Sequence, residues 1–519
     1  MRVVLGLDIG TSSTKALLAR FDGTVIAEVG RRHEVDRPEQ GLVEMDSRIW
    51  WDEFTTLTRE LLERVPDAEV AAVGVSGIGP CVLLTDGAGE PLRPAVLYGV
   101  DTRTAEMLAD VTAELGGEGA IRRRCGSALS TQAAGVKLAW AARHEPDVWA
   151  RAARFTMPSS RIVERLTGEY VLDHHSASQT TPLYDVHENA WIPEWCERLA
   201  PGLEMPRLLW SGDPAGAVTD AAAAATGLPA GIPVTAGTID AWAEGVSVGE
   251  SVPGRMFLQY GTTMFMIVPT SEPTAVPGMW TTVGTHPGQP SVSGGMATSG
   301  AITDWWRRLV DGDWATMLAE AESSGAGANG LLMLPYFAGE RTPIADPDAR
   351  GVVAGLTVRH TRGDLYRATL EATAFAVRHN VEVLREAGVE VRELVGAGGG
   401  LLGRLWPTIV TDVTGLPQTV PSVTIGACYG SAFLAASLVE AVDITTWNPP
   451  STVIEPDPDA YAAYEPGYRD YRELYEATKS VVHRLAERGR RSAPRGPDGG
   501  PRGGLLPGGP AGGSVDRSC

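Results

Sequence analysis

The 519-residue sequence has few cysteines and no long apolar run, and each absence excludes a class of protein. Its five cysteines are scattered without a CxxC pair, so neither a disulfide framework nor a zinc site is expected. No apolar stretch reaches the roughly 18–20 residues that a membrane span needs. A carboxylate at Asp8 interrupts the short apolar start, which is unlike a signal peptide. We therefore expect a cytoplasmic protein with no membrane partner.

Positive charge is scarce as well. The chain carries 44 lysines and arginines against 64 aspartates and glutamates, a net charge of −20. Nucleic acids and anionic membranes are bound through basic patches, so neither is expected as a partner. A nucleotide is not excluded, because backbone N–H groups and one metal ion can form a phosphate site. The Walker A pattern GxxxxGK[ST] is absent, so any phosphate site here is of another kind.

The length of the chain predicts more than one domain, because 519 residues are too many for a single compact core. We place one domain at residues 1–250 and a second at 251–485. From residue 486 the sequence becomes rich in Gly, Pro and Arg and loses apolar periodicity. Such a segment cannot bury enough surface to offset its ordering entropy, which predicts a disordered tail over 486–519. A binding tail is the alternative.

A short strand-turn-strand pattern occurs twice. The apolar run Val3–Ile9 leads into a Gly-Thr turn and a returning strand over Thr14–Phe21. The run that starts at Met256 leads into Gly261-Thr262-Thr263 and a second returning strand. The repetition favours an internally duplicated α/β fold. So short a match leaves coincidence as the alternative.

The first turn carries residue types that bind phosphate and a divalent cation. Gly10 lets the backbone turn tightly and approach a ligand closely. Hydroxyl and N–H donors come from Thr11, Ser12 and Ser13. Asp8, at the end of a buried strand, is placed to hold Mg²⁺ through water, since this ion takes one or two carboxylates. The alternative is a capped β-turn with a surface aspartate.

Asp240 is the candidate catalytic base. It follows the apolar run Ile232–Ala236 and opens a predicted helix. A helix N-terminus stabilises a carboxylate, so we expect Asp240 to stay ionised and to accept the proton of a hydroxyl that attacks a γ-phosphate. The alternative is an ordinary helix N-cap, a position at which aspartate is common.

Three further glycine-containing segments are candidates for contacts with a nucleotide. Gly261-Thr262-Thr263 is a second candidate phosphate turn. The glycines of Gly396–Leu401 would allow close approach by adenine and ribose, with a flexible loop as the alternative. A small-residue break at Gly300 precedes a predicted helix with Asp304, whose neighbours Trp305 and Trp306 we assign to the core.

The order of these motifs resembles the FGGY family of carbohydrate kinases. Leu334–Pro343 resembles the family's "GERTP" segment, and Gly351–Leu356 with Ala368–Glu371 is similar to its signature. The resemblance extends from about residue 3 to residue 480. It implies two RNase H-like α/β domains of the actin, Hsp70 and hexokinase superfamily, with a cleft between them. It also implies ATP, Mg²⁺ and a small sugar as ligands, and it leaves a homodimer open.

The resemblance also implies roles for single residues. Asp8 becomes the Mg²⁺ carboxylate and Asp240 the general base. The first phosphate motif contains Thr11, Ser12 and Lys15, and the second contains Gly261, Thr262 and Thr263. Contacts to the nucleotide fall on Gly300, Asp304, Gly399 and Gly400.

The sugar is less defined, although xylulokinases resemble the chain most. Their Gln-Met-His-Gly segment is replaced here by Gly77–Cys81, which puts Gly79 and Pro80 at the sugar and removes a histidine. Asp101 and Arg103 are expected to face the sugar, with a surface ion pair as the alternative. We therefore expect a kinase for a ketopentose. Another ketose, an aldonate or a polyol is the alternative substrate, and a nucleotide-driven switch protein or a sugar-binding regulator is the alternative of another class.

Overall fold

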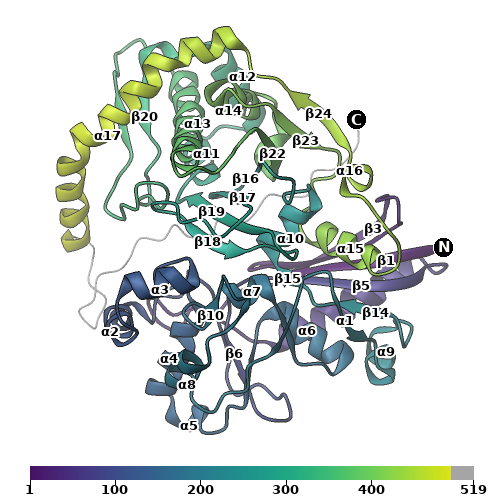
Figure 1. The fold of residues 1–519 in the computed structure, drawn as a ribbon. Coiled ribbons are helices and arrows are strands. Elements are labelled where there is room, and N and C mark those ends of the chain that lie inside the picture. Colours follow the sequence, from purple (N-terminus) through teal and green to yellow (C-terminus); the bar gives the residue numbers. More distant parts are fainter. Residues whose placement is uncertain (493–519) are drawn as a thin grey trace.

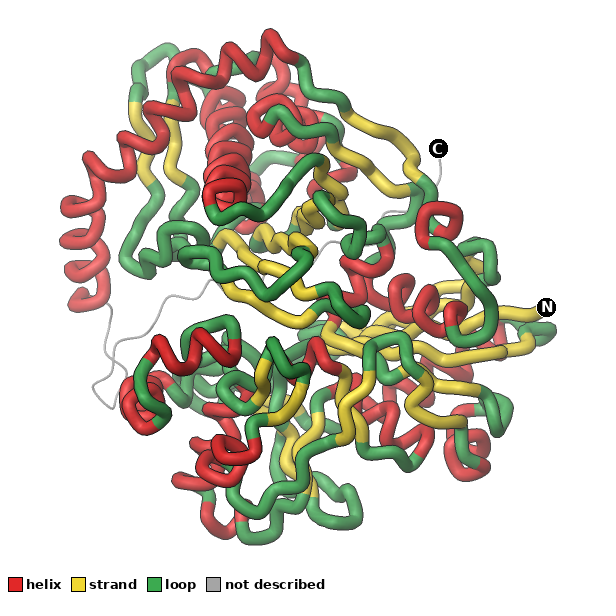
Figure 2. Tube along the Cα trace, viewed as in Figure 1, coloured by secondary structure: helices red, strands yellow, loops and turns green. Residues whose placement is uncertain are grey.

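Two sheets organise the part of the chain, residues 1–492, that the computed structural model describes. Strands of each half lie between helices (Figures 1 and 2). Within these described residues no helix is long and apolar enough to cross a membrane. The architecture is the two-domain α/β fold expected from the sequence.

The first sheet has the order β13-β14-β5-β1-β2-β3, and β15 adds to β5. Its strands are β1 (Arg2–Ile9), β2 (Ser13–Ala19), β3 (Val25–Arg32), β5 (Glu69–Gly77), β13 (Pro214–Ala217), β14 (Pro233–Thr235) and β15 (Thr238–Ile239). β1 and β5 pair in parallel at the centre and are apolar on both faces. This explains why they appear in the sequence as continuous apolar runs rather than alternating ones.

The second sheet has the order β18-β19-β17-β16-β22-β23-β24. Its strands are β16 (Arg255–Tyr260), β17 (Met264–Pro269), β18 (Trp280–Val283), β19 (Pro290–Met296), β22 (Glu393–Ala397), β23 (Gln418–Pro421) and β24 (Pro450–Ile454). The series β3-β2-β1-β5-β14-β13 and β19-β17-β16-β22-β23-β24 have the same succession of antiparallel and parallel pairings. The predicted duplication is therefore confirmed at the level of topology.

Helices cover both faces of the first sheet. Alternate β1 residues Val3, Leu5 and Leu7 pack with α1 (Arg48–Arg64) and α6 (Pro158–Thr167). Val4, on the other face, packs with α15 (Ala427–Ser437), which also contacts α10 (Asp240–Ser247). The second sheet is covered by α11 (Gly300–Leu309), α13 (Arg362–Glu386) and α14 (Leu405–Thr414). Outside these helices, α12 (Trp314–Ser324) packs on α13, and α17 (Pro458–Ser492) packs on α14.

A smaller region with its own core follows the first strands and lies below the second sheet in Figure 1. Its helices are α2 (Leu108–Glu114), α3 (Glu118–Cys125), α4 (Ala134–His144), α5 (Pro146–Trp149), α7 (His174–Ser178) and α8 (Pro193–Leu199). The remaining short elements are α9 (Asp220–Thr226), α16 (Ile444–Trp447), β4 (Glu44–Met45), β6 (Leu83–Thr85), β7 (Ala95–Val96), β8 (Arg154–Thr156), β9 (Val171–Asp173), β10 (Tyr184–Asp185), β11 (Ala190–Trp191), β12 (Arg207–Leu209), β20 (Leu332–Leu334) and β21 (Val352–Ala354).

The boundaries drawn from the sequence need two corrections. A division at residues 250 and 251 separates the two sheets, but α15 belongs to the second half of the chain and packs on the first sheet. The tail predicted from residue 486 begins inside α17, which continues to Ser492. Residues 493–519 lie outside the described part of the chain.

Glycines make the close approach of α15 possible. A Cβ on Gly6 of β1 would lie 2.0 Å from the carbonyl oxygen of Cys428, and one on Gly74 of β5 would lie 1.9 Å from that of Ser431. A Cβ on Gly430 of α15 would lie 1.8 Å from the carbonyl oxygen of Ala243 in α10. Helix α15 therefore packs directly against the backbone of β1, β5 and α10. In this way it holds α10 against the first sheet.

Candidate functional site

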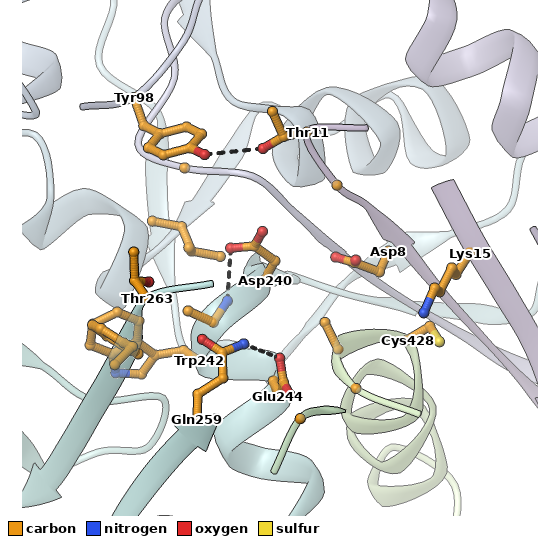
Figure 3. Close-up of a pocket in the computed structure, with 18 of the residues that line it drawn as sticks. Asp8, Thr11, Lys15, Tyr98, Asp240, Trp242, Glu244, Gln259, Thr263 and Cys428 are labelled. Carbon is orange, nitrogen blue, oxygen red and sulfur yellow. Dashed lines mark hydrogen bonds between the residues drawn. The ribbon is translucent and has the colours of Figure 1, made fainter. Parts of the chain in front are cut away.

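A cavity of about 500 Å³ lies where the two halves meet, and residues of both line it (Figure 3). It brings together many of the residues singled out in the sequence. They are Asp8, Thr11, Ser12, Ser13, Lys15, Gly79, Pro80, Asp240, Thr263 and Gly399. Because these positions lie far apart along the chain, their meeting in one cavity is a property of the fold.

Each Gly-Thr turn is closed by a hydrogen bond from its glycine N–H, although the first turn is one residue longer than the second. At the β1–β2 turn, Gly10 N–H donates to the carbonyl of Ser13 at 2.9 Å. At the β16–β17 turn, Gly261 N–H donates to the carbonyl of Thr263 at 3.1 Å. Helix α11 begins directly on the second turn, since Gly300 N–H donates to the carbonyl of Gly261 at 3.0 Å. A Cβ on Gly300 would lie 2.5 Å from that oxygen, so the position requires glycine.

Asp240 is the first residue of α10, and Ile239 is the N-cap. The Asp240 carboxylate accepts from the N–H of Ala241 at 2.8 Å and lies across the cavity from Asp8 (Figure 3). The alternative that Asp240 is the N-cap of this helix is therefore wrong. Its carboxylate faces the cavity from the end of the helix.

The electrostatics of this cavity differ from the expectation that the helix terminus keeps Asp240 ionised. Burial, and then the nearby Asp8, raise the pKa of Asp240 to about 8, against the hydrogen bond from Ala241. Burial raises the pKa of Asp8 to about 6, although Ser76 donates to it at 2.8 Å and Lys15 is near. Desolvation and like charge outweigh the helix terminus, and a bound cation would favour the ionised form of both carboxylates.

Glu244 is a cavity residue that sequence reasoning missed. It lies one turn after Asp240 on α10, and burial raises its pKa to about 7. Its carboxylate accepts from the side-chain amide of Gln259 (Figure 3). Gln259 has the place in the second hairpin that Asp8 has in the first. The spacing of four residues from Asp240 was the available signal, because residues i and i+4 share a helix face.

Tyr98 and a set of polar and aromatic residues were also missed. The Tyr98 hydroxyl lies 3.2 Å from the Thr11 hydroxyl, which links Tyr98 to the first Gly-Thr turn (Figure 3). Other residues that line the cavity and were missed are Gln132, Gln179, Trp280 and Arg341. Isolated amides and aromatics have no characteristic spacing, so the sequence held no signal for Tyr98, Gln132, Gln179 and Trp280. Arg341 lies in the Leu334–Pro343 segment, which was singled out without a role for this residue.

The comparisons with known proteins agree with this geometry. The N-terminal domain of the FGGY family of carbohydrate kinases matches residues 3–246, and the C-terminal domain of that family matches residues 256–439. The chain belongs to the FGGY family. As a member it is an ATP-dependent carbohydrate kinase, and the prediction made from the motifs is confirmed.

Several FGGY relatives are similar over nearly their whole length. The chain is 27% identical to a xylulose kinase of Staphylococcus xylosus, with 84% of this chain and 91% of that protein covered. It is 30% identical to a glycerol kinase of Nocardia farcinica, with 86% and 94% covered. The crystal structure of a xylulose kinase from Rhodospirillum rubrum superposes with a TM-score of 0.86 at 33% identity, covering 93% of this chain and 100% of that chain.

Two residues of this FGGY kinase that were expected at the sugar do not line the cavity. The Asp101 carboxylate is fully buried and accepts from Arg103 at 2.8 Å and from Val43 N–H at 2.7 Å. Arg103 also pairs with Glu44 at 2.7 Å. The pair lies neither among the residues that line the cavity nor on the surface. It is a buried network that fixes the loop after β7, because buried charges are stable only when paired.

The remaining predicted nucleotide contacts are not among the residues that line the cavity. Asp304 pairs within α11 with Arg307 at 2.9 Å and with Arg308. A Cβ on Gly400 would lie 2.8 Å from Tyr260, so this glycine serves packing in the described structure. Gly261 and Thr262 belong to the second turn without lining the cavity. Trp306 is buried, as expected.

Glu250 lines a small pocket together with Trp242, which also lines the main cavity of this kinase. Its carboxyl accepts from Thr285 at 3.1 Å, and burial raises its pKa from 4.5 to about 7. A folded-state pKa above the unfolded one means that stability is lost as pH rises from about 4.5 to about 7. Glu250→Gln is expected to remove this loss, so its free energy of unfolding relative to wild type should increase over this range by up to about 3 kcal/mol.

Urea unfolding at a series of pH values measures this difference. Glu197→Gln, at an exposed position on α8, is the matched control and should show a difference that does not depend on pH. A Glu250→Gln curve parallel to the wild-type curve across the range would contradict the prediction.

Proposed function

We propose that this kinase transfers the γ-phosphoryl group of ATP to a hydroxyl of a small sugar, with Asp240 as the general base. The observation that supports the proposal is that the Asp240 carboxylate, Thr11 of the first turn and Thr263 of the second turn line one cavity. An acceptor held beside Pro80 and Tyr98 would present its hydroxyl to Asp240. Phosphoryl transfer depends mainly on such positioning and on charge stabilisation.

The proton of the acceptor hydroxyl would pass to the Asp240 carboxylate. The hydrogen bond from Ala241 N–H fixes one carboxylate oxygen and leaves the other toward the cavity. A base contributes only when it is ionised and within reach of the hydroxyl. The N–H and hydroxyl groups of the two turns would hold the phosphate oxygens during transfer.

The residues present fit a bound Mg²⁺. Asp8, Asp240 and Glu244 line the same cavity, and the pKa of each is raised above its usual value. A dication would offset that concentration of negative charge. Among the described residues no three His, Cys, Asp or Glu side chains form a metal-binding cluster. Mg²⁺ takes one or two carboxylates and keeps several waters. Asp8 and Glu244 would hold the ion, which supplies positive charge to the transferring phosphoryl group.

The acceptor we propose is a ketopentose. Relatives named xylulose kinase from several bacteria support it. Another ketose, an aldonate or a polyol is the alternative, because Pro80 lines the cavity where the xylulokinase pattern has its distinctive segment, and its ring offers no hydrogen bond to a hydroxyl. Dimerisation and a cytoplasmic location remain predictions.

A screen of ADP release tests the function. Pentuloses, hexuloses, gluconate, erythritol and glycerol are the acceptors, each compared with ATP alone. One acceptor should raise ADP release far above the rate without acceptor. ATP turnover that no acceptor changes would instead favour the nucleotide-driven switch protein.

Glu244→Gln is expected to raise the Mg²⁺ concentration for half-maximal activity by about tenfold, because one charged ligand to the ion becomes neutral. The amide keeps the size of the side chain and can still pair with Gln259. A Mg²⁺ titration of ADP release, together with Mg²⁺-dependent nucleotide affinity, measures the effect. Glu320→Gln, in an exposed pair with Arg362, is the control. An unchanged Mg²⁺ requirement in Glu244→Gln would remove this residue from the metal site.

A further inference from the structure

A second cavity, of about 680 Å³, continues the reaction cavity between the two halves. The residues that line both are Tyr98, Gln132, Gln179, Thr263, Trp280 and Arg341. Volumes of this order are typical of ligand sites. The second cavity therefore provides space for the parts of the ligands that are remote from Asp240.

The charge of this second cavity is unlike that of the protein as a whole. The chain has a net charge of −20, yet the charged side chains that line the second cavity are two arginines, Arg122 and Arg341, and no carboxylate. Arg122 forms an exposed pair with Glu118 at 2.6 Å. Arg341 forms no ion pair with any residue of the described part of the chain. The charge of the adjacent Glu340 favours the charged form of Arg341, but the two side chains form no ion pair.

The hydrogen bond that positions the Arg341 side chain is made with a backbone carbonyl, not with a carboxylate. One guanidinium nitrogen donates to the carbonyl of Met296 at 2.9 Å. The adjacent Glu340 is engaged elsewhere, since its carboxylate accepts from the backbone N–H groups of Ala297 and Arg341, each at 2.7 Å. A guanidinium has five N–H donors, so most of its donors are available to a ligand.

The position of Arg341 narrows the kind of ligand. Its side chain lines the reaction cavity together with Thr263 of the second phosphate turn and with Tyr98, which contacts Thr11 of the first turn. Guanidinium groups match the planar pairs of oxygens found in carboxylates and phosphates. We propose that Arg341 binds an oxyanion in the reaction cavity, either the transferring phosphoryl group or a carboxylate of the acceptor. This inference rests on the proposed function, because that function puts both ligands in the cavity.

Binding measurements on Arg341→Gln and Arg341→Lys distinguish the two sources. Calorimetry gives the affinities for MgATP, for MgADP and for MgADP with aluminium fluoride, which mimics the phosphoryl group in transfer. If the phosphoryl group is the oxyanion, Arg341→Gln should weaken MgATP or the fluoride complex by about 10- to 100-fold and leave MgADP unchanged, as for loss of a charge-assisted hydrogen bond. The affinities of Arg341→Lys should lie between those of wild type and Arg341→Gln, because lysine keeps the positive charge but loses the paired N–H donors of the guanidinium.

If an acceptor carboxylate is the oxyanion, nucleotide affinities should stay unchanged. Wild-type enzyme should then prefer gluconate to the matched neutral polyol glucitol in kcat/KM, and Arg341→Gln should lose that preference. Arg143→Gln, in an exposed pair with Glu114, is the control, and melting temperatures check that the variants fold. Unchanged nucleotide affinities together with no Arg341-dependent preference for gluconate would overturn the proposal. The proposed function fails separately, if wild-type enzyme phosphorylates no acceptor while Arg341→Gln still weakens MgATP.

Discussion

Asp240→Asn is expected to lower turnover by about 10²- to 10⁴-fold, the range of a lost general base. The amide keeps the size of the carboxylate but cannot accept the acceptor proton. The two phosphate turns are made by backbone and hydroxyl groups that the substitution does not touch. MgATP affinity should therefore stay within about tenfold of wild type. Steady-state ADP release and calorimetric titration of MgATP measure the two effects.

The control for this experiment is Asp220→Asn. Asp220 is also the first residue of a short helix, α9, but it lies outside the cavity residues. It should leave turnover unchanged, which separates the loss of a helix-terminal charge from the loss of a base. Near wild-type turnover in Asp240→Asn would remove Asp240 from the mechanism. A matching loss of MgATP affinity would assign it to nucleotide binding instead.

Gly430→Ala is expected to destabilise the fold by about 1–3 kcal/mol, as overpacking usually does, and to lower activity as well. The new Cβ would lie 1.8 Å from the carbonyl oxygen of Ala243 and 3.1 Å from the backbone nitrogen of Ser247, so α10 and α15 must separate. Backbone atoms cannot move aside as a flexible side chain can. Because α10 carries Asp240, the shift reaches the Asp240 carboxylate, the proposed general base. Urea unfolding and ADP release measure the two consequences.

Gly87→Ala is the matched control. A Cβ at Gly87 would meet no atom within 4 Å, so this substitution should leave both stability and activity close to wild type. A Gly430→Ala protein as stable as wild type would mean that α10 and α15 can repack without cost. Normal stability with lost activity would place the effect on Asp240 alone.

The strands, the Gly-Thr turns and the two candidate aspartates of this kinase could be predicted from the sequence. β1 and β16 are apolar runs that end in Gly-Thr turns, and strand and turn propensities depend mainly on neighbouring residues. Asp8 and Asp240 stood out because a carboxylate directly after an apolar run is a local pattern. The order of several such motifs was enough to predict the family and the two-domain fold.

Only the tertiary structure decided which side chains meet. Asp101 and Arg103 had a plausible position along the chain, but the fold buries them in a network with Glu44. Glu244 follows Asp240 by four residues and Arg341 lies in the Leu334–Pro343 segment, but neither pattern assigned a role to the residue, and only the fold brings both to the cavity of Asp240. The physical reason is that contacts between residues far apart in sequence depend on packing. Here glycines such as Gly430 let α15 hold α10 against the first sheet, and no local propensity specifies that arrangement.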